Sequence, residues 1–331
     1  MANDVERLEA IQAVRHMAVG DAARVIRVYA LTRELVPAPL LAHAEVWEAM
    51  IDRMPIPALV RDLGAMGAAG LLVDGSDAAR TVVARLDDGA AIRRARVHPV
   101  ALLAARQAYA RGHGAGASEG WVPVPQVIDA LDRAFHLALA NVPPTGKRIL
   151  LALDVSRSMD APVRGLSSLS CREAAAAMAL VTAASEPSCR VVAFTARTVP
   201  RLRAAARGAR PEAELTPLAI PRGARVDDVV RMTRELPAGG TDCALPIAEA
   251  LVHGWDVDAF VVYTDTGAWA GAIHPAQLLR EYRECMGIAA KLVVVAMAST
   301  GFRIADPADA GMLDVAGFDA STPHVVREFL E

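Results

Sequence analysis

The stretch LLALDVSRSMD, residues 150–160, places three small oxygen-bearing side chains where an aliphatic run ends. Asp154 closes the run, and Ser156 and Ser158 follow it at alternate positions. A hard divalent cation such as Mg²⁺ prefers oxygen ligands, with one or two carboxylates and several waters, and this single turn can supply one carboxylate and two hydroxyls. Taken alone, however, Ser and Asp after a strand are more typical of a cap on the next helix.

Two later segments offer further oxygen ligands. GGTDC contains Thr241 and Asp242 after a flexible Gly-Gly pair, and either side chain can serve. VVYTDT contains Asp265 at the end of another aliphatic run. Segments that follow parallel strands converge at the edge where the strands end, which is where open α/β sheets bind ligands. The three segments together therefore favour a metal site over three separate helix caps.

The second half of the chain predicts the sheet that this convergence needs. Short aliphatic runs alternate with helical segments, which indicates a mostly parallel sheet covered on both faces. The predicted strands are 149–154, 190–195, 259–265 and 291–298. The predicted helices are 169–185, 226–236, 244–253 and 275–285. In this order Asp154 and Asp265 both lie at the carboxyl ends of strands.

The first half, from residue 3 to about 140, has apolar residues at helical spacing and predicts no strand. Beyond its first thirty or so residues, the predicted helices are 39–52, 55–67, 75–87, 98–111 and 124–140. Successive antiparallel helices of this length are typical of an α-solenoid, although no residue-level repeat is visible. With a linker at about 141–147 and a length of 331 residues, the chain is expected to form two domains.

Composition excludes several classes of protein. The formal net charge of -3 gives no global basic signature, so a nucleic-acid surface would have to be local. No window is long and uncharged enough for a membrane span, and the N-terminus does not resemble a signal peptide, so we expect a cytoplasmic protein without a membrane partner. The four cysteines show no metal or disulfide spacing and are expected to be buried free thiols: Cys171, Cys189, Cys243 and Cys285.

The three oxygen-rich segments resemble the metal-ion-dependent adhesion site of von Willebrand factor A domains. The five positions of that site fall on Asp154, Ser156, Ser158, Thr241 and Asp265. Longer stretches are similar to the Ro ribonucleoprotein autoantigen family, namely PTGKRILLALDVSRSM, PAGGTDCALPIAEA, FVVYTDTGAWAGAIHPAQLLREYR and IADPADAGMLDVAGFD. Two earlier stretches, HAEVWEAMIDRMPIPALVRDLGAMG and RARVHPVALLAARQAYARGHG, resemble the end of the helical TROVE module of that family.

The resemblance implies an α plus α/β fold. Residues 1–143 would form an α-helical, HEAT-like repeat domain, and residues 144–331 a Rossmann-like von Willebrand factor A domain that holds Mg²⁺ or another divalent cation. Members of that family carry a longer helical module, so the resemblance implies a shortened member that lacks about half of the helical ring, including the part that contacts Y RNAs. Thr266 stands where an Asn is common in the family, which changes the loop and not a metal ligand.

A basic segment lies in the helical half. Residues 89–118 contain no acidic side chain, and they carry the candidate RNA-binding residues Arg93, Arg94, Arg96, His98, Arg106, Arg111 and His113. Such a run can neutralise phosphates without sequence preference. The alternative is an ordinary solvated face with arginines at helix C-termini. Trp47, Tyr109 and Trp121 are expected to pack in the core, and His98 and His136 to be structural.

Three functions compete. The resemblance favours a non-enzymatic RNA-binding protein whose partner is non-coding RNA, either Y-RNA-like or the 3′ end of a misfolded RNA. Its A domain would recognise a protein partner through the metal, and protomers would form a homo-oligomer that completes the ring. The alternative is a metal-dependent protein-interaction module without RNA binding. An enzyme is disfavoured, because a haloacid-dehalogenase-type phosphatase needs a carboxylate where Ser156 stands and no phosphate-binding loop is present.

Overall fold

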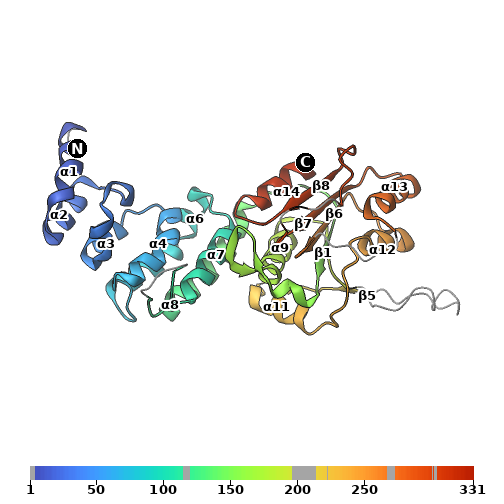
Figure 1. Cartoon of the computed structure of the whole chain (residues 1–331), viewed down its shortest axis with the longest axis horizontal. Coiled ribbons are helices and arrows are strands. Elements are labelled where there is room, and N and C mark those ends of the chain that lie inside the picture. Colours follow the sequence, from blue (N-terminus) through green and yellow to red (C-terminus); the bar gives the residue numbers. More distant parts are fainter. Residues whose placement is uncertain are drawn as a thin grey trace. The chain divides into compact units, whose positions relative to one another are not determined.

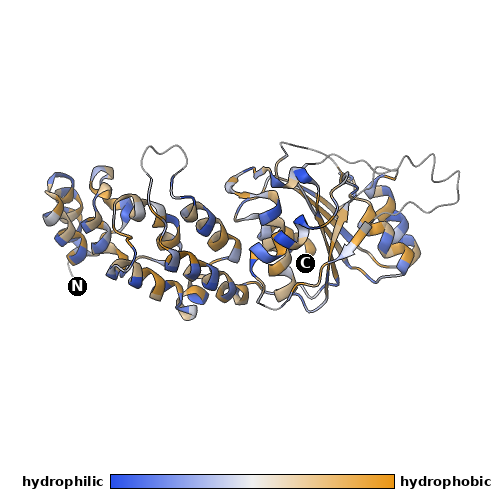
Figure 2. Ribbon diagram, turned by 90° about the horizontal axis from the view of Figure 1, so that it is seen from below, coloured by the Kyte–Doolittle hydropathy of each residue, from blue (hydrophilic) through white to orange (hydrophobic). Residues whose placement is uncertain are grey.

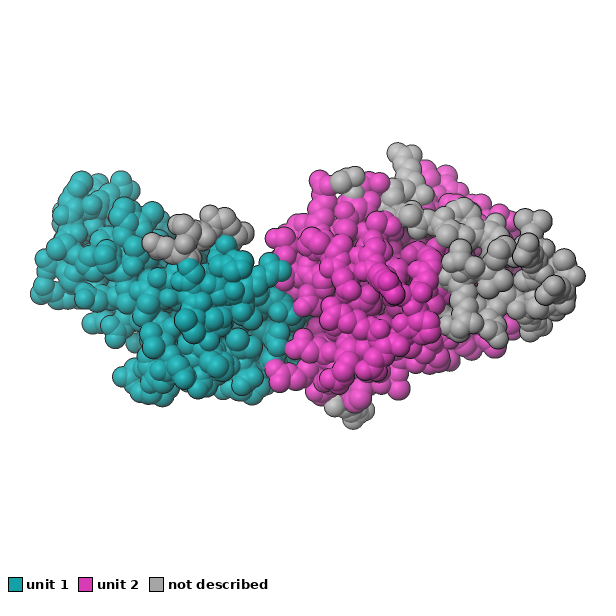
Figure 3. All heavy atoms as spheres, turned by 60° about the horizontal axis from the view of Figure 1, so that its bottom comes forward, with its two compact units in different colours: residues 1–141 teal, residues 142–331 magenta. Residues whose placement is uncertain are grey.

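The chain folds into two compact units, Met1–Asn141 and Val142–Glu331, which Figure 3 distinguishes by colour. The division falls two residues before the domain boundary expected from the sequence. The structure is a computed structural model, and it describes residues 4–114, 120–195, 214–221, 223–266, 273–299, 301 and 304–331. Among these residues, no helix combines the length and the apolar character that crossing a membrane requires.

The first unit is helical, and its described part contains no strand (Figure 1). Its α-helices are α1 Asp4–Ala13, α2 Val19–Tyr29, α3 Ala44–Ile51, α4 Ile56–Ala68, α5 Asp77–Leu86, α6 Gly89–Ala95, α7 Pro99–Ala110 and α8 Pro125–Ala138. Short 3₁₀ helices at Val14–His16, Arg33–Leu35, Ala38–Ala42 and Leu139–Asn141 connect or extend them. The sequence predicted α7 at 98–111 but missed α6, whose seven residues are too short for a periodic signal.

Local capping explains where several of these helices begin. The side chain of Ser76 accepts a hydrogen bond from the Ala79 amide at the start of α5, and Asp88 does the same for Ala91 at the start of α6. Helices α7 and α8 begin with a proline, whose missing amide hydrogen costs nothing in the first turn. Caps and prolines thus set the helix starts, while buried apolar faces hold the helices together.

Trp121 anchors the segment that precedes α8. Its ring lies so close to Gly64 and Gly67 of α4 that a Cβ atom at either glycine would come within 2.8 Å of a ring carbon. Its indole nitrogen donates to the carbonyl oxygen of Tyr109 at 2.9 Å, and the two aromatic rings stack. Trp47 and Tyr109 are buried. The expectation that these three aromatic residues pack within the helical unit is therefore confirmed.

The second unit is built on a six-stranded sheet in the order β5-β4-β1-β6-β7-β8. The strands are β1 Ile149–Asp154, β4 Cys189–Thr195, β5 Glu214–Pro217, β6 Ala259–Thr264, β7 Lys291–Ala296 and β8 Met312–Ala316. All neighbouring pairs are parallel except β4 with β5. A small antiparallel hairpin, β2 Pro162–Val163 with β3 Leu166–Ser170, follows β1. The von Willebrand factor A-type fold predicted from the sequence is confirmed.

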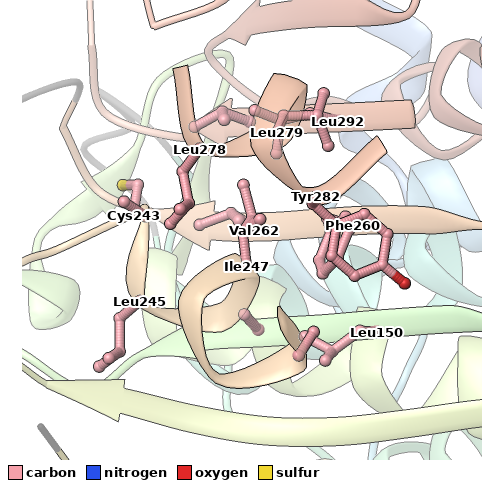
Figure 4. Close-up of a cluster of buried hydrophobic side chains, with 14 of the residues drawn as sticks. Leu150, Cys243, Leu245, Ile247, Phe260, Val262, Leu278, Leu279, Tyr282 and Leu292 are labelled. Carbon is pink, nitrogen blue, oxygen red and sulfur yellow. The ribbon is translucent and has the colours of Figure 1, made fainter. Parts of the chain in front are cut away.

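Helices cover both faces of this sheet (Figure 1). One face carries α9 Cys171–Ser185, α11 Val226–Arg234 and α14 Thr322–Leu330, and the other carries α12 Leu245–His253 and α13 Pro275–Met286. Figure 2 shows apolar strands between helices whose outer sides are hydrophilic. In the cluster of Figure 4, Phe260 and Val262 of β6 pack against Leu278, Leu279 and Tyr282 of α13.

The four predicted strands and four predicted helices of this unit are present, with ends that differ by one or two residues. The sequence missed β2, β3, β5, β8 and α14. The hairpin strands and β5 are short, and β8 is MLDVA, in which Asp314 interrupts the apolar run. Edge strands and short hairpins bury fewer side chains, so their sequences carry a weaker pattern.

Candidate metal centre and basic segment

The carboxyl ends of β1 and β6 bring the three oxygen-rich segments together. β1 lies between β4 and β6, so Asp154 at its end and Asp265 just after β6 share one edge of the sheet. The chain runs from β1 to β4 on one side and later returns to β6 on the other side of β1, and such switch points leave room for a ligand. Ser158 donates to Oδ1 of Asp265, with the two oxygens 3.0 Å apart. The first and last segments therefore touch, as expected.

The remaining ligand candidates join the same hydrogen-bonded cluster. The hydroxyl oxygens of Ser156 and Ser158 lie 3.0 Å apart. Thr241 donates to Oδ2 of Asp154 at 2.9 Å. The backbone amide of Ser156 donates to Oδ1 of Asp154 at 2.7 Å and joins these contacts. Direct hydrogen bonds therefore connect all five residues predicted as metal ligands, although they come from three segments of the chain.

Thr241 and Asp242, which spacing alone left as alternative ligands, make different contacts in the structure. Thr241 contacts Asp154, whereas the side chain of Asp242 accepts a hydrogen bond from the Ala244 amide at 3.1 Å. Asp242 thus stabilises the turn that leads into α12. The contact to Asp154 makes Thr241 the ligand candidate of this segment.

Asp154 is held as a buried carboxylate by three donors. It is 1% exposed and accepts hydrogen bonds from the Ser156 amide at 2.7 Å and from the hydroxyls of Thr241 and Thr264. Burial raises the pKa of Asp154, and these hydrogen bonds oppose the rise. The donors therefore support the charged form that a metal ligand needs.

Thr264 belongs to this hydrogen-bonded cluster, and the sequence reasoning missed it. It is fully buried as the last residue of β6, and its hydroxyl donates to Oδ2 of Asp154 at 2.8 Å. Because Thr264 and Thr241 donate to the same oxygen, they fix the orientation of the carboxylate group. The only sequence signal was its place in VVYTD, directly before Asp265.

The donor set fits a hard divalent cation. Asp265 is 4% exposed, and neither it nor Asp154 forms a salt bridge within the described part of the chain. Two buried carboxylates without a basic partner are costly unless a cation compensates them. No group of three or more His, Cys, Asp or Glu side chains suited to a metal occurs among the described residues. A metal here would thus be held by two carboxylates, hydroxyls and water, which suits Mg²⁺ rather than Zn²⁺.

The four cysteines are all free, and none belongs to the predicted ligand set. Cys171 and Cys243 are buried as expected, but Cys189 is only partly buried and Cys285 is exposed. Burial, together with the charge of Asp265, raises the pKa of Cys171 to about 12. Its thiol is therefore protonated at neutral pH.

The structure divides the basic segment into exposed and packed side chains. Arg93 and Arg94 lie in the last turn of α6, and Arg96 follows it with a positive φ of 50°. These three, with Arg111 and His113 after α7, are exposed. Their positions at or beyond helix C-termini are favourable for cations.

The other two candidates of the basic segment have packing roles. His98 caps α7 by accepting a hydrogen bond from the Val100 amide at 3.2 Å, and burial lowers its pKa to about 4. It is therefore neutral at physiological pH, in agreement with the structural role that the sequence suggested. Arg106 is mostly buried and forms an ion pair with Asp132 of α8, with 2.9 Å between Nε and Oδ1.

Known proteins with similar sequences and structures match nearly the whole chain. A protein of Caenorhabditis elegans named RNA-binding protein RO60 is 40% identical over 307 residues, which are 92% of this chain and 45% of that protein. A Deinococcus radiodurans protein of the same name is 40% identical over 310 residues, covering 93% and 55%. The chain therefore spans about half the length of these relatives.

The crystal structure of the Deinococcus radiodurans RO (RSR) protein superposes with a TM-score of 0.87 at 39% identity, over 98% of this chain and 62% of that one. Residues 28–115 match the TROVE domain model. Residues 148–330, more than half of the chain, match the model of the Ro60 vWA domain. The chain therefore belongs to the Ro60 family, with a TROVE-type helical unit followed by a Ro60-type von Willebrand factor A domain.

Proposed function

We propose that this chain is a non-enzymatic RNA-binding protein that takes small or misfolded non-coding RNA on its helical unit. The observation that carries the proposal is the exposed cluster of Arg93, Arg94 and Arg96 inside the region that matches the TROVE domain. Two relatives at 40% identity are named RNA-binding proteins, which supports it. Because the chain spans only about half the length of these relatives, the class of RNA is also our proposal. It is either a Y-RNA-like RNA or the 3′ end of a misfolded RNA.

RNA binding through these side chains is electrostatic. Exposed guanidinium groups neutralise phosphates and release counterions, which gives an affinity that falls steeply with salt and depends little on sequence. The neutral His98 and the ion-paired Arg106 contribute to the fold instead of to phosphate binding.

The second unit would hold Mg²⁺ or another divalent cation with Asp154, Ser156, Ser158, Thr241 and Asp265. When bound, the metal offers an open position that attracts an acidic group from a protein partner. The buried carboxylates set the charge of the site, and the hydroxyls of Ser158 and Thr241, which donate to these carboxylates, would supply further oxygen ligands. RNA and protein recognition would then reside in different units of the chain.

We do not propose a catalytic activity for this metal centre. Ser156 stands where a haloacid-dehalogenase-type phosphatase needs its second carboxylate, and it hydrogen-bonds to Ser158 and Asp154. The hydrogen bonds that join the five ligand candidates involve no histidine, so no general base is assigned. Recognition requires only the cation and its open position.

The alternative function is a metal-dependent protein-interaction module without RNA binding. It is favoured by the packing roles of His98 and Arg106, which remove two of the seven candidate RNA-binding residues. Gel mobility of a structured RNA with a single-stranded tail separates the two functions. A shift at low salt that weakens as salt rises supports RNA binding, whereas no shift even at low salt supports the alternative.

The test variant replaces Arg93, Arg94 and Arg96 by Gln, and the control replaces Arg7, Arg15 and Arg24, which are exposed on the first helices. Both remove three charges. We expect the test variant alone to bind RNA more weakly, with the slope of log K against log salt reduced by about 0.7 for each phosphate that is no longer neutralised. An equal effect of the two variants would show a nonspecific charge effect and contradict an RNA site at α6.

We also propose that the protein is cytoplasmic and that its protomers associate. Four free cysteines suit a reducing compartment. Val5 and Leu8 of α1 and Val28 of α2 are between 57% and 71% exposed, so the first two helices present apolar side chains that a second protomer could cover. A second protomer that covers these side chains would extend the helical stack toward a ring. Light scattering that shows only monomer across micromolar concentrations would exclude the association.

A further inference from the structure

A buried arginine lies beside the turn that carries Ser156 and Ser158. Arg172, the second residue of α9, is 4% exposed. Its Nη2 donates to the carbonyl oxygen of Ser156 at 2.8 Å, and its Nε donates to Oδ1 of Asp160 at 3.0 Å. The guanidinium group therefore contacts the turn on both sides of Ser158, at Ser156 before it and at Asp160 after it.

The turn itself is short and depends on few other hydrogen bonds. It continues as a 3₁₀ helix from Arg157 to Asp160, in which the Met159 amide donates to the carbonyl oxygen of Ser156 at 3.2 Å. The same oxygen thus accepts from Arg172 and from Met159. The Ala161 amide donates to the carbonyl oxygen of Ser158 at 2.9 Å. Hydrogen exchange at the Met159 and Ala161 amides therefore shows whether the turn keeps its shape.

Stability alone gives no reason for an arginine here. A buried guanidinium group is costly, and Nη1 of Arg172 has no hydrogen-bond partner among the described residues. Asp160, by contrast, is 48% exposed and has a second basic partner. An ion pair with a half-exposed carboxylate is a weak reason to bury Arg172, and its hydrogen bond to the Ser156 carbonyl oxygen points to a geometric role.

Asp160 links the turn to a second ligand-bearing segment. Its Oδ1 also accepts from Nη2 of Arg234 at 3.0 Å. Arg234 is the last residue of α11, and the chain runs from there to Thr241 in seven residues. One carboxylate oxygen thus ties the turn with the serine ligands to the helix that precedes the threonine ligand.

We propose that Arg172 is a positioning residue for the metal centre and that Asp160 and Arg234 make the geometry of the serine turn depend on α11. The part that concerns metal rests on the proposed function of the second unit. Arg172 fixes the Ser156 peptide so that the hydroxyls of Ser156 and Ser158 face the buried carboxylates. A shift of α11 reaches both the serine turn and the Thr241 segment through Asp160.

Charge and geometry predict opposite effects at Arg172. As a positive charge near the site, Arg172 repels a cation, so its removal would raise metal affinity. As a positioning group, it uses a planar fork to reach a carbonyl oxygen and a carboxylate at once, which a lysine ammonium cannot reproduce. Replacement by Lys keeps the charge and removes the fork, and therefore separates the two effects.

The experiment measures Mn²⁺ affinity of the full chain by calorimetry, with Mn²⁺ as the probe for Mg²⁺. We expect Arg172→Lys to weaken Mn²⁺ binding about ten-fold, as for other residues that orient metal ligands. Arg234→Gln, at a side chain that is 57% exposed, should weaken it about two- to five-fold. Arg231→Gln is the matched control, because Arg231 is 66% exposed on the same helix and pairs with Asp228 instead.

Hydrogen exchange in EDTA gives a second readout that needs no metal. Arg172→Lys should speed exchange of the Met159 and Ala161 amides, while amides in the middle of α9 keep the wild-type rate. If wild-type protein does not bind Mn²⁺, the proposed metal site fails, and this exchange still decides whether Arg172 fixes the turn. Unchanged exchange at both amides would overturn that role.

Two further outcomes contradict the proposal. Equal Mn²⁺ affinities of the wild type and Arg172→Lys would show that the fork is not needed. An increase in affinity for Arg172→Met without a decrease for Arg172→Lys would leave only an electrostatic effect. If the Arg172 variants do not fold, the test is the comparison of Mn²⁺ affinity between Arg234→Gln and Arg231→Gln. Equal Mn²⁺ affinities of these two variants would overturn the coupling through Asp160.

Discussion

Thr264 donates its hydroxyl hydrogen to Oδ2 of Asp154 at 2.8 Å, which joins two residues 110 positions apart at neighbouring strand ends. Thr241 donates to the same oxygen at 2.9 Å. Oδ2 of Asp154 thus accepts one hydrogen bond from the end of β6 and one from the loop that follows Gly239 and Gly240. The Ser156 amide donates to the other oxygen, Oδ1. Three hydrogen bonds from three different residues therefore set the orientation of the Asp154 carboxylate.

Thr264→Val removes one of these donors with almost no change in shape. We expect the free energy of unfolding without metal to fall by about 1–2 kcal/mol, because a charged acceptor is deprived of a buried hydrogen bond. Mn²⁺ affinity should also fall, since Asp154 is less firmly oriented. Denaturant unfolding in EDTA and calorimetry with Mn²⁺ measure the two effects.

The control for this prediction is Thr233→Val. Thr233 is also buried, but its hydroxyl donates to the carbonyl oxygen of Val230 within α11. The control should be less stable than the wild type without a change in Mn²⁺ affinity. A similar fall in affinity for both threonine variants would show that affinity follows general stability, which would contradict a specific role of Thr264.

Asp265→Asn should not destabilise the protein without metal, but it should abolish the stabilisation by metal. Without a cation, Asp154 and Asp265 are two buried negative charges in one cluster, and neutralising one relieves their repulsion. The asparagine oxygen can still accept from Ser158. We expect the melting temperature in EDTA to equal or exceed that of the wild type, and the stabilisation by millimolar Mg²⁺ to disappear.

Glu284→Gln on α13 is the charge-matched control, because Glu284 is exposed. It should leave both the melting temperature in EDTA and its increase with Mg²⁺ unchanged. A wild-type protein that is not stabilised by Mg²⁺ or Mn²⁺ would contradict the metal centre itself. A clear decrease in the stability of Asp265→Asn in EDTA would contradict the repulsion argument.

The sequence predicted that the three oxygen-rich segments meet, because the signals for this convergence are local. Asp154 and Asp265 each end a long apolar run, and the parallel order of such runs places their ends at one edge. Spacing alone left Thr241 and Asp242 as alternatives, because both stand in one loop, and it was the resemblance to the adhesion site that selected Thr241. The structure places Thr241 against Asp154 and Asp242 against the Ala244 amide. This difference depends on which side chain the turn into α12 directs toward Asp154.

Interactions between distant segments were beyond the sequence reasoning. From the sequence alone, Thr264 cannot be told from an ordinary strand residue, and Arg172 cannot be told from an exposed charged residue near a helix start. Their roles depend on β1 lying beside β6 and on α9 packing over the serine turn. The basic segment shows the same limit, since the sequence could not tell that Arg106 pairs with Asp132 while Arg93 faces solvent.

His98 predicts a pH dependence of the helical unit. Burial lowers its pKa from 6.5 to about 4 in the folded protein. Between these pH values the unfolded chain binds a proton that the folded chain does not, so stability falls as pH drops through this range and levels off below it. The decrease should reach about 3 kcal/mol relative to neutral pH.

His98→Asn isolates this effect, because asparagine can cap α7 but does not titrate. Urea unfolding at pH 7, 5 and 4 should show that the stability of the variant decreases less than that of the wild type as pH falls. Parallel pH profiles of the two proteins would mean that His98 is not the group responsible.

Gly67→Ala tests the packing of Trp121 against α4. Alanine favours a helix over glycine by about 1 kcal/mol, but the new Cβ atom would lie 2.8 Å from the Trp121 ring. The ring would have to move, and with it the hydrogen bond to Tyr109 and the stacked pair. Overpacking of this kind costs about 1–3 kcal/mol, so the net effect should be destabilising.

Gly20→Ala is the matched control for this helix substitution. Gly20 lies in α2, and the nearest atom to its new Cβ, an oxygen of Glu45, would be 3.8 Å away. We therefore expect Gly20→Ala to raise the melting temperature slightly and Gly67→Ala to lower it. Tryptophan fluorescence should also shift to longer wavelength in Gly67→Ala, because Trp121 becomes more exposed. Stabilisation by both substitutions would show that the segment before α8 can move without cost, and that Trp121 does not anchor it.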